Sequence, residues 1–274
     1  MIQKAIDEIK SKDYLLIAAG AGMGVDSGLP DFRGKEGFWR AYPKANELGL
    51  NFADLANPSW FRDDAKLAWA FYGDRLNLYR KTIPHLGFKL LLEIAKDKKD
   101  YFVVTSNVDG QFQKAGFSES KIDEIHGSIH YLQCINGCKR DIWSAKDIKI
   151  DIDYKSFQAK EPLPKCPHCS NLARPNILMF GDYKWIEDRE SKQRENLQKF
   201  LSKVDFNNLS IIEFGAGTAV ATIRYFSESI SKEFGTKLIR VNPRDYHDAP
   251  ISLKFGAKEA IEKIYKGYFN QSYS

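Results

Sequence analysis

Residues 14–24 read YLLIAAGAGMG, an apolar run that leads directly into a turn with three glycines. A short apolar run that ends in glycine is typical of a strand buried on both faces of a parallel sheet. A helical pattern covers residues 82–99. Three further runs resemble the first: YFVVTSN at 101–107, LSIIEFGAG at 209–217 and TKLIRVN at 236–242. We therefore predict an α/β fold with a parallel sheet covered by helices on both faces.

The carboxyl ends of these four strands carry residues suited to binding a ligand. Gly20, Asn107, Gly215 and Asn242 each lie at such an end. Ligands of open parallel sheets bind outside the carboxyl ends of the strands. The first turn offers backbone N–H groups to a phosphate, although glycines in a tight turn need no ligand. It is not the usual dinucleotide-binding pattern, because Val25 stands where the third glycine belongs.

The cysteines form two close pairs. Cys134 and Cys138 belong to CINGC, and Cys166 and Cys169 belong to CPHC. We expect no secretory signal, so the pairs predict a metal site before disulfides, with free buried thiols as the alternative. Four thiolates suit tetrahedral Zn²⁺ and leave no open position, which indicates a structural ion. Gly137 can adopt the positive φ that the longer first knuckle needs.

Composition narrows the class of protein. The chain has 274 residues, of which 43% are hydrophobic, and its mean hydropathy is −0.44. It contains no apolar run long enough to span a membrane. The first residues, MIQKAIDEIKSKDY, resemble an amphipathic helix and not a signal peptide, so we expect a cytoplasmic protein without membrane association. The net charge of +5 is spread along the chain, which argues against nucleic-acid binding.

Seven motifs, in the same order along the chain, resemble those of bacterial-type members of the sirtuin family, the NAD-dependent protein lysine deacylases. They cover nearly the whole chain. They are GAGMGVDSGLPDFRG at 20–34, TSNVDG at 105–110, HGS at 126–128, the two cysteine pairs, RPNILMFGD at 174–182, GAGTAV at 215–220 and VN at 241–242.

This resemblance implies two domains. Residues 1–34, 82–132 and 174–274 would form a Rossmann-like NAD-binding domain. A smaller inserted domain would consist of a helical module with the cofactor loop at 35–81 and a zinc ribbon at 133–173.

The resemblance also implies a reaction and its residues. With NAD as co-substrate, an acyl group leaves a protein or peptide lysine, giving nicotinamide and O-acyl-ADP-ribose. His126 would be the general base, Asn107 would orient the nicotinamide ribose, and Asp109 would hold the carboxamide. The NAD-contacting residues would be Gly20, Ala21, Gly22, Asp31, Phe32, Arg33, Ser106, Asn107, Asp109, Gly217, Thr218 and Asn242, and the peptide-contacting ones Met179, Phe180 and Gly181.

Tyr72 and Arg75 resemble the Tyr-x-x-Arg pair of sirtuins that remove negatively charged acyl groups such as succinyl or malonyl. A hydroxyl and a guanidinium together can hold a carboxylate. The alternative places Arg75 on the solvent face of a helix and Tyr72 in the core.

Four positions depart from the family pattern: Gly24, Ser106, Ala219 and Asp182 replace Ser, Gln, Ser and Glu. They put the acyl preference and the rate in question.

Three other functions remain open from the sequence. The same site could perform mono-ADP-ribosyl transfer or NAD cleavage, with a different nucleophile. The chain could also be a catalytically silent module that binds NAD or acyl-lysine. A zinc-ribbon nucleic-acid protein fits least, because aromatic and basic residues do not cluster around the cysteines. No oligomeric state is predicted.

Overall fold

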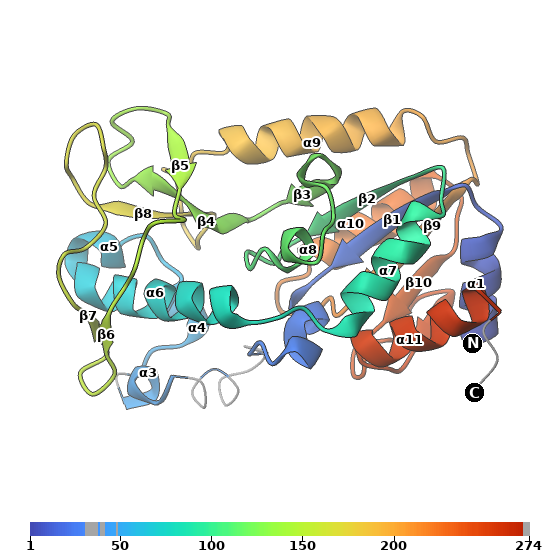
Figure 1. Cartoon of the computed structure of the whole chain (residues 1–274), viewed down its shortest axis with the longest axis horizontal. Helices are drawn as coiled ribbons and strands as arrows, with labels where there is room; N and C mark the ends of the chain where they lie inside the picture. Colours follow the sequence, from blue (N-terminus) through green and yellow to red (C-terminus); the bar gives the residue numbers. More distant parts are fainter. Residues whose placement is uncertain (31–37, 39–41, 48, 271–274) are drawn as a thin grey trace.

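The computed structural model describes residues 1–30, 38, 42–47 and 49–270. Its main sheet has six strands in the order β11-β10-β9-β1-β2-β3, all parallel. Figure 1 shows this sheet and its helices beside a smaller part that carries α3–α6 and the strands β4–β8. The sheet strands are β1 Tyr14–Ala19, β2 Asp100–Thr105, β3 Ile122–Glu124, β9 Leu209–Phe214, β10 Leu238–Val241 and β11 Ile251–Leu253.

The four strands predicted from the sequence form the centre of this sheet, each slightly shorter than predicted. The helix predicted over 82–99 is also shorter: α7 spans Leu86–Lys96. Thr82 instead ends the preceding helix, α6 Ala65–Lys81. His85 caps the start of α7, since its Nδ1 accepts the Gly87 amide hydrogen at 3.1 Å.

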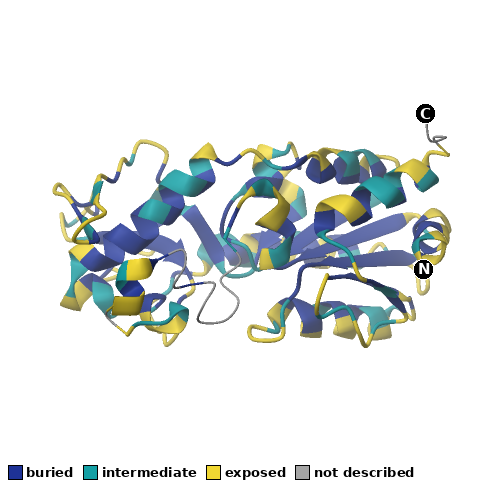
Figure 2. Ribbon diagram, turned by 90° about the horizontal axis from the view of Figure 1, so that it is seen from below, coloured by how far each residue is buried: buried dark blue, intermediate teal, exposed yellow. Residues whose placement is uncertain are grey.

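Alternate residues of β1 serve two different cores. Leu15, Ile17 and Ala19 pack with α1 Ile2–Lys10, α7 and α11 Ala257–Tyr268. Leu16 and Ala18 pack with α9 Asp188–Leu201 and α10 Thr222–Glu233. Figure 2 shows the strands buried between these helical layers. This two-sided burial explains why the strand sequences are uninterrupted apolar runs.

The smaller part has a hydrophobic core of its own, to which both segments predicted as insertions contribute, with Trp69 and Phe71 from one and Ile135 and Phe157 from the other. The domain limits given above stay predictions. Its elements are α3 Pro43–Glu47, α4 Phe52–Leu55, α5 Trp60–Asp63, α6, the antiparallel strands β5 Ile142–Ser144, β4 Gly127–Cys134 and β8 Ala173–Ile177, and the pair β6 Ile152–Asp153 and β7 Gln158–Ala159.

Three short helices lie in the connections at the sheet, η1 after β1 and the other two between β2 and β3. They are η1 Ala21–Ser27, α8 Gln111–Lys114 and η2 Glu119–Lys121. Along the described residues, no helix combines the length and apolar character that a membrane crossing requires.

Candidate active site

Two glycine turns touch at the carboxyl edge of the sheet. The Gly20 amide donates to the Phe214 carbonyl at 2.9 Å, and the Gly22 amide donates to the Gly215 carbonyl at 3.1 Å. Gly215 has φ +57°, and a Cβ there would lie 2.3 Å from the Gly22 Cα. Only glycine fits this approach, so the two turns that the sequence places far apart are packed backbone to backbone.

Asn107 joins the loop after β2 to the first glycine turn. Its Nδ2 donates to the Gly20 carbonyl at 3.0 Å, and its backbone amide donates to the Thr105 Oγ1 at 3.0 Å. The Thr105 hydroxyl in turn donates to the Ala19 carbonyl at 3.0 Å. Three short hydrogen bonds therefore fix the Asn107 side chain against the turn that follows β1.

His126 lies between β3 and β4, at the same edge of the sheet. Its ring lies close to the backbone of Ser106, the residue before Asn107. Burial lowers the pKa of His126 below its ordinary value of 6.5. The ring is therefore neutral at neutral pH and able to accept a proton.

Asp109 is buried beneath this loop. Its Oδ1 accepts the Gln111 amide hydrogen at 2.9 Å, and its carbonyl oxygen lies 3.0 Å from the His130 Nε2. Burial raises the pKa of Asp109 to about 6, against the opposing effect of the Gln111 hydrogen bond. The carboxyl group is therefore ionised at neutral pH and protonated in mild acid.

An exposed segment runs from β8 past His126. The Leu178 amide donates to the His126 carbonyl, and the Phe180 amide donates to the Ala56 carbonyl, both at 2.9 Å. Leu178 and Phe180 are exposed, whereas Met179 between them is buried. Gly181 ends the segment with φ +68°. Hydrogen bonds to His126 and Ala56 thus anchor the segment at two points, and its alternate side chains face solvent.

Arg75 is buried, contrary to the alternative that placed it on a solvent face: only 6% of it is exposed. Its guanidinium carbon lies 5.2–5.7 Å from the ring centres of four aromatic residues, and its Nε donates to the Tyr79 hydroxyl at 3.0 Å. The four rings belong to Phe52, Phe71, Tyr72 and Tyr79. Aromatic faces stabilise a cation that has left water, which explains how this charge is tolerated in the core.

Tyr72 lies in the core, as that alternative expected, and its side chain is fully buried. Within the described part of the chain, its hydroxyl has no hydrogen-bond partner. A buried hydroxyl without a partner is costly, so a ligand group that reaches it gains a hydrogen bond. Burial also raises the pKa of Tyr72, which keeps the hydroxyl protonated.

Asn242 is fully buried at the end of β10 and bonded to the protein. Its Nδ2 donates to the Ala216 carbonyl at 3.0 Å, and its Oδ1 accepts the backbone amides of Arg244 and Asp245, each at 3.0 Å. It therefore ties the second glycine turn to the loop after β10. Thr218, in the same turn, is exposed.

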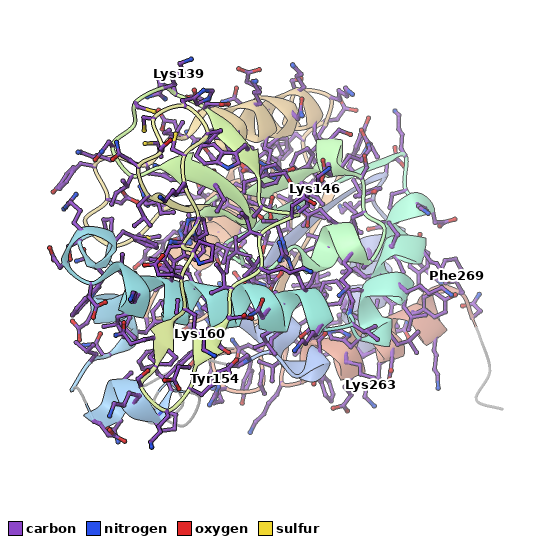
Figure 3. The ribbon with its side chains drawn as sticks, turned by 60° about the vertical axis from the view of Figure 1, so that its left-hand side comes forward. Lys139, Lys146, Tyr154, Lys160, Lys263 and Phe269 are labelled. Atoms are coloured by element: carbon purple, nitrogen blue, oxygen red, sulfur yellow. The ribbon has the colours of Figure 1, made fainter. Side chains whose placement is uncertain are left out.

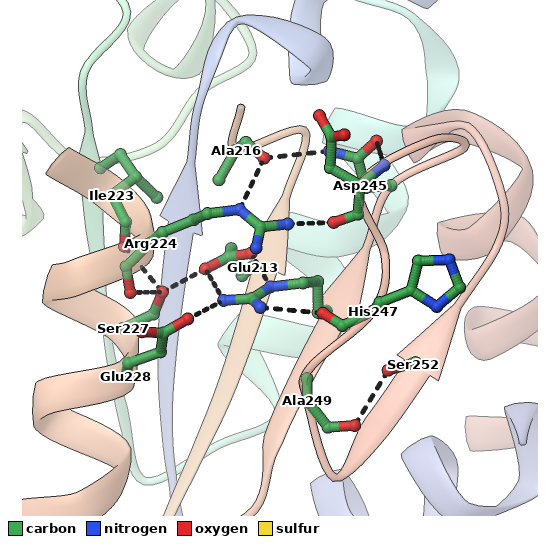
Figure 4. A network of polar contacts seen from close by, with 12 residues as sticks. Glu213, Ala216, Ile223, Arg224, Ser227, Glu228, Asp245, His247, Ala249 and Ser252 are labelled. Atoms are coloured by element: carbon green, nitrogen blue, oxygen red, sulfur yellow. Dashed lines mark hydrogen bonds and ion pairs between the residues drawn. The ribbon is translucent and has the colours of Figure 1, made fainter. Parts of the chain in front are cut away.

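A buried ionic network lies beside the second glycine turn and the loop after β10, and it was not predicted from the sequence (Figure 4). Arg240 in β10 lies opposite Glu213 in β9, with its Nε 2.5 Å from the Glu213 Oε1. It also contacts Glu228 at 2.7 Å and the His247 carbonyl at 3.1 Å. Arg224 of α10 bonds the Ala216 and Asp245 carbonyls. The signal in the sequence was a charged residue inside each of two apolar runs, Glu213 in one and Arg240 in the other.

The four cysteines come together at the tip of the smaller part. Their sulfur atoms all lie within 4.8 Å of one another, and Gly137 in the first knuckle has φ +61°. This donor set fits a tetrahedral zinc ion without an open position. His168 is not part of it, because its Nε2 contacts the Asp141 Oδ2 at 2.7 Å. Lys139, which follows Cys138, marks the outer surface of this ribbon in Figure 3.

Three residues expected to contact NAD lie outside the described residues: Asp31, Phe32 and Arg33. Among the other candidates, Gly20 and Asn107 meet through the hydrogen bond given above, and His126 lies close to Ser106. Asp109 bonds Gln111 and His130 instead.

A family model described as Sir2 family matches residues 20–206. The chain belongs to the Sir2 family. This Sir2 protein is 31% identical to the NAD-dependent protein deacylase of Thermococcus kodakarensis, over 88% of its own chain and 84% of that relative. It is 27% identical to the NAD-dependent protein deacetylase of Caldivirga maquilingensis, over 96% and 91%. Its fold matches a solved Sir2 homolog–NAD complex with a TM-score of 0.72 at 24% identity, over 98% and 94% of the two chains.

Proposed function

We propose that this Sir2 protein is an NAD-dependent protein lysine deacylase. The observation that carries the proposal is one continuous series of contacts through the site. A hydrogen bond joins Gly20 to Asn107, the backbone of the neighbouring Ser106 lies close to the His126 ring, and a second hydrogen bond joins the His126 carbonyl to the Leu178 amide. A nucleotide-binding turn, a neutral base and an exposed peptide-binding segment are therefore held at fixed positions relative to one another, which is what a two-substrate reaction requires.

His126 acts as the general base in this account. Bound NAD supplies the ribose carbon that the acyl oxygen attacks as nicotinamide leaves, and it finally carries the acyl group. His126 removes the proton from the ribose hydroxyl that attacks the acyl carbon. Burial keeps the imidazole neutral for this step. One water is consumed overall, and lysine, nicotinamide and O-acyl-ADP-ribose are the products.

The residues around the two glycine turns bind NAD. Backbone N–H groups suit its phosphates, and Asn107 lies where the loop after β2 meets the first turn, with Asp109 two residues further along that loop. We assign Asn107 to the nicotinamide ribose and Asp109 to the carboxamide. The complete set is Gly20, Ala21, Gly22, Asp31, Phe32, Arg33, Ser106, Asn107, Asp109, Gly217, Thr218 and Asn242.

The peptide substrate adds as a strand along Met179, Phe180 and Gly181, where β8 gives way to a turn and Leu178 and Phe180 are exposed. The zinc held by the four cysteines is structural and takes no part in the reaction. It fixes the ribbon at one end of strands β4 and β8, and the other end of the same two strands carries both His126 and the start of the peptide segment.

The acyl groups removed include acetyl and, through Tyr72 and Arg75, succinyl or malonyl. The buried Arg75 charge lies beside Phe52, and the Phe52 ring contacts Phe180 of the peptide segment at 6.4 Å between centres. A negatively charged acyl group that reaches this cluster pairs with Arg75 and gives the Tyr72 hydroxyl a partner.

The test is a mass-spectrometric assay with NAD and matched acetyl- and succinyl-lysine peptides. We expect loss of the acyl group together with O-acyl-ADP-ribose, and no turnover with His126→Ala. Arg75→Met should reduce desuccinylation and spare deacetylation. Nicotinamide release without a deacylated lysine would instead support ADP-ribosyl transfer or NAD cleavage.

A further inference from the structure

A hollow of about 140 Å³ lies directly beside the peptide segment. Gly181, which ends the segment, also lines this hollow, so the hollow begins where the segment stops. Arg62 of α5 lines another wall, and Tyr183 and Lys184 follow from the turn after β8. A peptide that pairs with residues 178–181 and continues in the same direction passes over it.

The floor of the hollow carries no net charge. Asp182 receives two parallel hydrogen bonds from Arg174, at 2.7 and 2.9 Å, and both side chains are buried. The Asp182 carboxylate also accepts the backbone amides of Met179 and Lys184, at 3.4 and 3.2 Å. Its charge is balanced and its oxygens are occupied, so Asp182 neither repels an anion nor attracts a cation.

The rim of the hollow is positive. Arg62 and Lys184 are both exposed, and neither forms an ion pair with any described carboxylate. Asp182 is the one acidic residue among the described residues that line the hollow. Because it is already neutralised, two cations remain to act on whatever enters.

We propose that this hollow is a subsite for an acidic side chain, Asp or Glu, that flanks the acyl-lysine in the substrate. The inference deepens the proposed function and rests on it. The volume is sufficient for one carboxylate side chain, and the position beside Gly181 places it along the peptide. Tyr183, which is 99% exposed, can cover the stem of that side chain.

The expected preference is moderate, because both cations are exposed and screened by solvent. Exchanging Glu for Lys at the flanking position should change kcat/KM on the order of three- to tenfold, mainly through KM.

The experiment uses a set of acyl-lysine peptides that differ only at one flanking position, which carries Glu, Gln or Lys, with each flanking position tested in turn. Turnover with NAD is measured for the wild type and for the double variant Arg62→Glu, Lys184→Glu. The matched control is Lys160→Glu, an exposed lysine at the end of β7 (Figure 3). Binding of the same peptides, labelled with a fluorophore, is measured separately without turnover.

At one flanking position the wild type and the Lys160 variant should prefer Glu over Lys, and the double variant should prefer Lys over Glu, in turnover and in binding alike. Deacylation that ignores the flanking charge, or a preference that the double variant leaves unchanged, would overturn the subsite and leave the proposed function standing. If the wild type deacylates no peptide, the proposed function fails, and the binding series still decides on the subsite.

Discussion

The amide of Gly22 donates to the carbonyl of Gly215 at 3.1 Å, which joins the turn after β1 to the turn after β9. The two residues lie 193 positions apart in the chain (215 − 22). Their contact forms the part of the site that we assign to the NAD phosphates, and it leaves no room for a side chain at Gly215.

Replacing Gly215 by Ala should therefore abolish NAD binding and lower the free energy of unfolding by about 2–5 kcal/mol, from positive φ and steric overlap together. Gly49→Ala is the control, because Gly49 also has positive φ, +70°, but a Cβ there meets nothing within 4 Å. Calorimetric NAD titration and urea unfolding measure both effects. Equal loss of stability in the two variants, with NAD binding intact in the first, would contradict the assignment.

The Arg240–Glu213 pair should stabilise the ends of β9 and β10, where Asn242 lies. Arg240→Met leaves the buried Glu213 carboxylate without its partner and should cost about 3–5 kcal/mol of unfolding free energy. The double variant Arg240→Met, Glu213→Leu removes both charges and should recover most of that loss. Urea unfolding of the three proteins checks this. A double variant less stable than Arg240→Met would show that the pair does not act as described.

The strands that frame the site could be predicted from the sequence, but this pair could not. The apolar runs at 14–20 and 209–217 depend only on local composition, which burial on both faces of a sheet dictates. The pairing of Glu213 with Arg240 depends on the register between β9 and β10, which no local pattern specifies. A charged residue inside an apolar run indicates that it needs a partner, but the local sequence does not specify which residue that partner is.

Arg75 illustrates the same limit. From the sequence, Arg75 could equally lie on a solvent face of α6, because charged residues are interspersed with apolar ones along this helix. Phe52 of the short helix α4 helps to enclose the guanidinium, and that contact joins two separate helices. The cysteine spacing, by contrast, was enough to predict the cluster, because both halves of the metal site are local knuckles.

The pH dependence of turnover should report His126. Burial lowers its pKa, so the neutral, active form persists below pH 6.5, and activity should fall only in more acidic solution. Asp109, with a pKa raised to about 6, titrates in a similar range. The variant Asp109→Asn separates the two.

A profile of kcat/KM against pH should retain its acid limb in Asp109→Asn, at reduced activity. The exposed His247 provides a control, since His247→Ala should leave the profile unchanged. An acid limb above pH 6.5 in the wild type, or its loss in Asp109→Asn, would argue against His126 as the titrating base.

Zinc should stabilise the ribbon without taking part in chemistry. Cys138→Ser should lose the metal and lower the melting temperature, because ligand binding energy contributes to folding of such a site. NAD binding should persist, since the glycine turns belong to the sheet. Metal analysis and thermal melts test this, with His168→Ala as the control that keeps its zinc. A wild type without zinc, or a Cys138 variant that retains it, would refute the four-cysteine site.

The most direct test of the central claim is the stoichiometry of one reaction mixture. Nicotinamide, deacylated peptide and O-acyl-ADP-ribose are quantified together by mass spectrometry, with wild type and with His126→Ala. We expect the three products to accumulate in equal amounts in the wild type and no deacylated peptide to form in the variant. Nicotinamide in excess of deacylated peptide, or ADP-ribose attached to the protein or peptide, would contradict it.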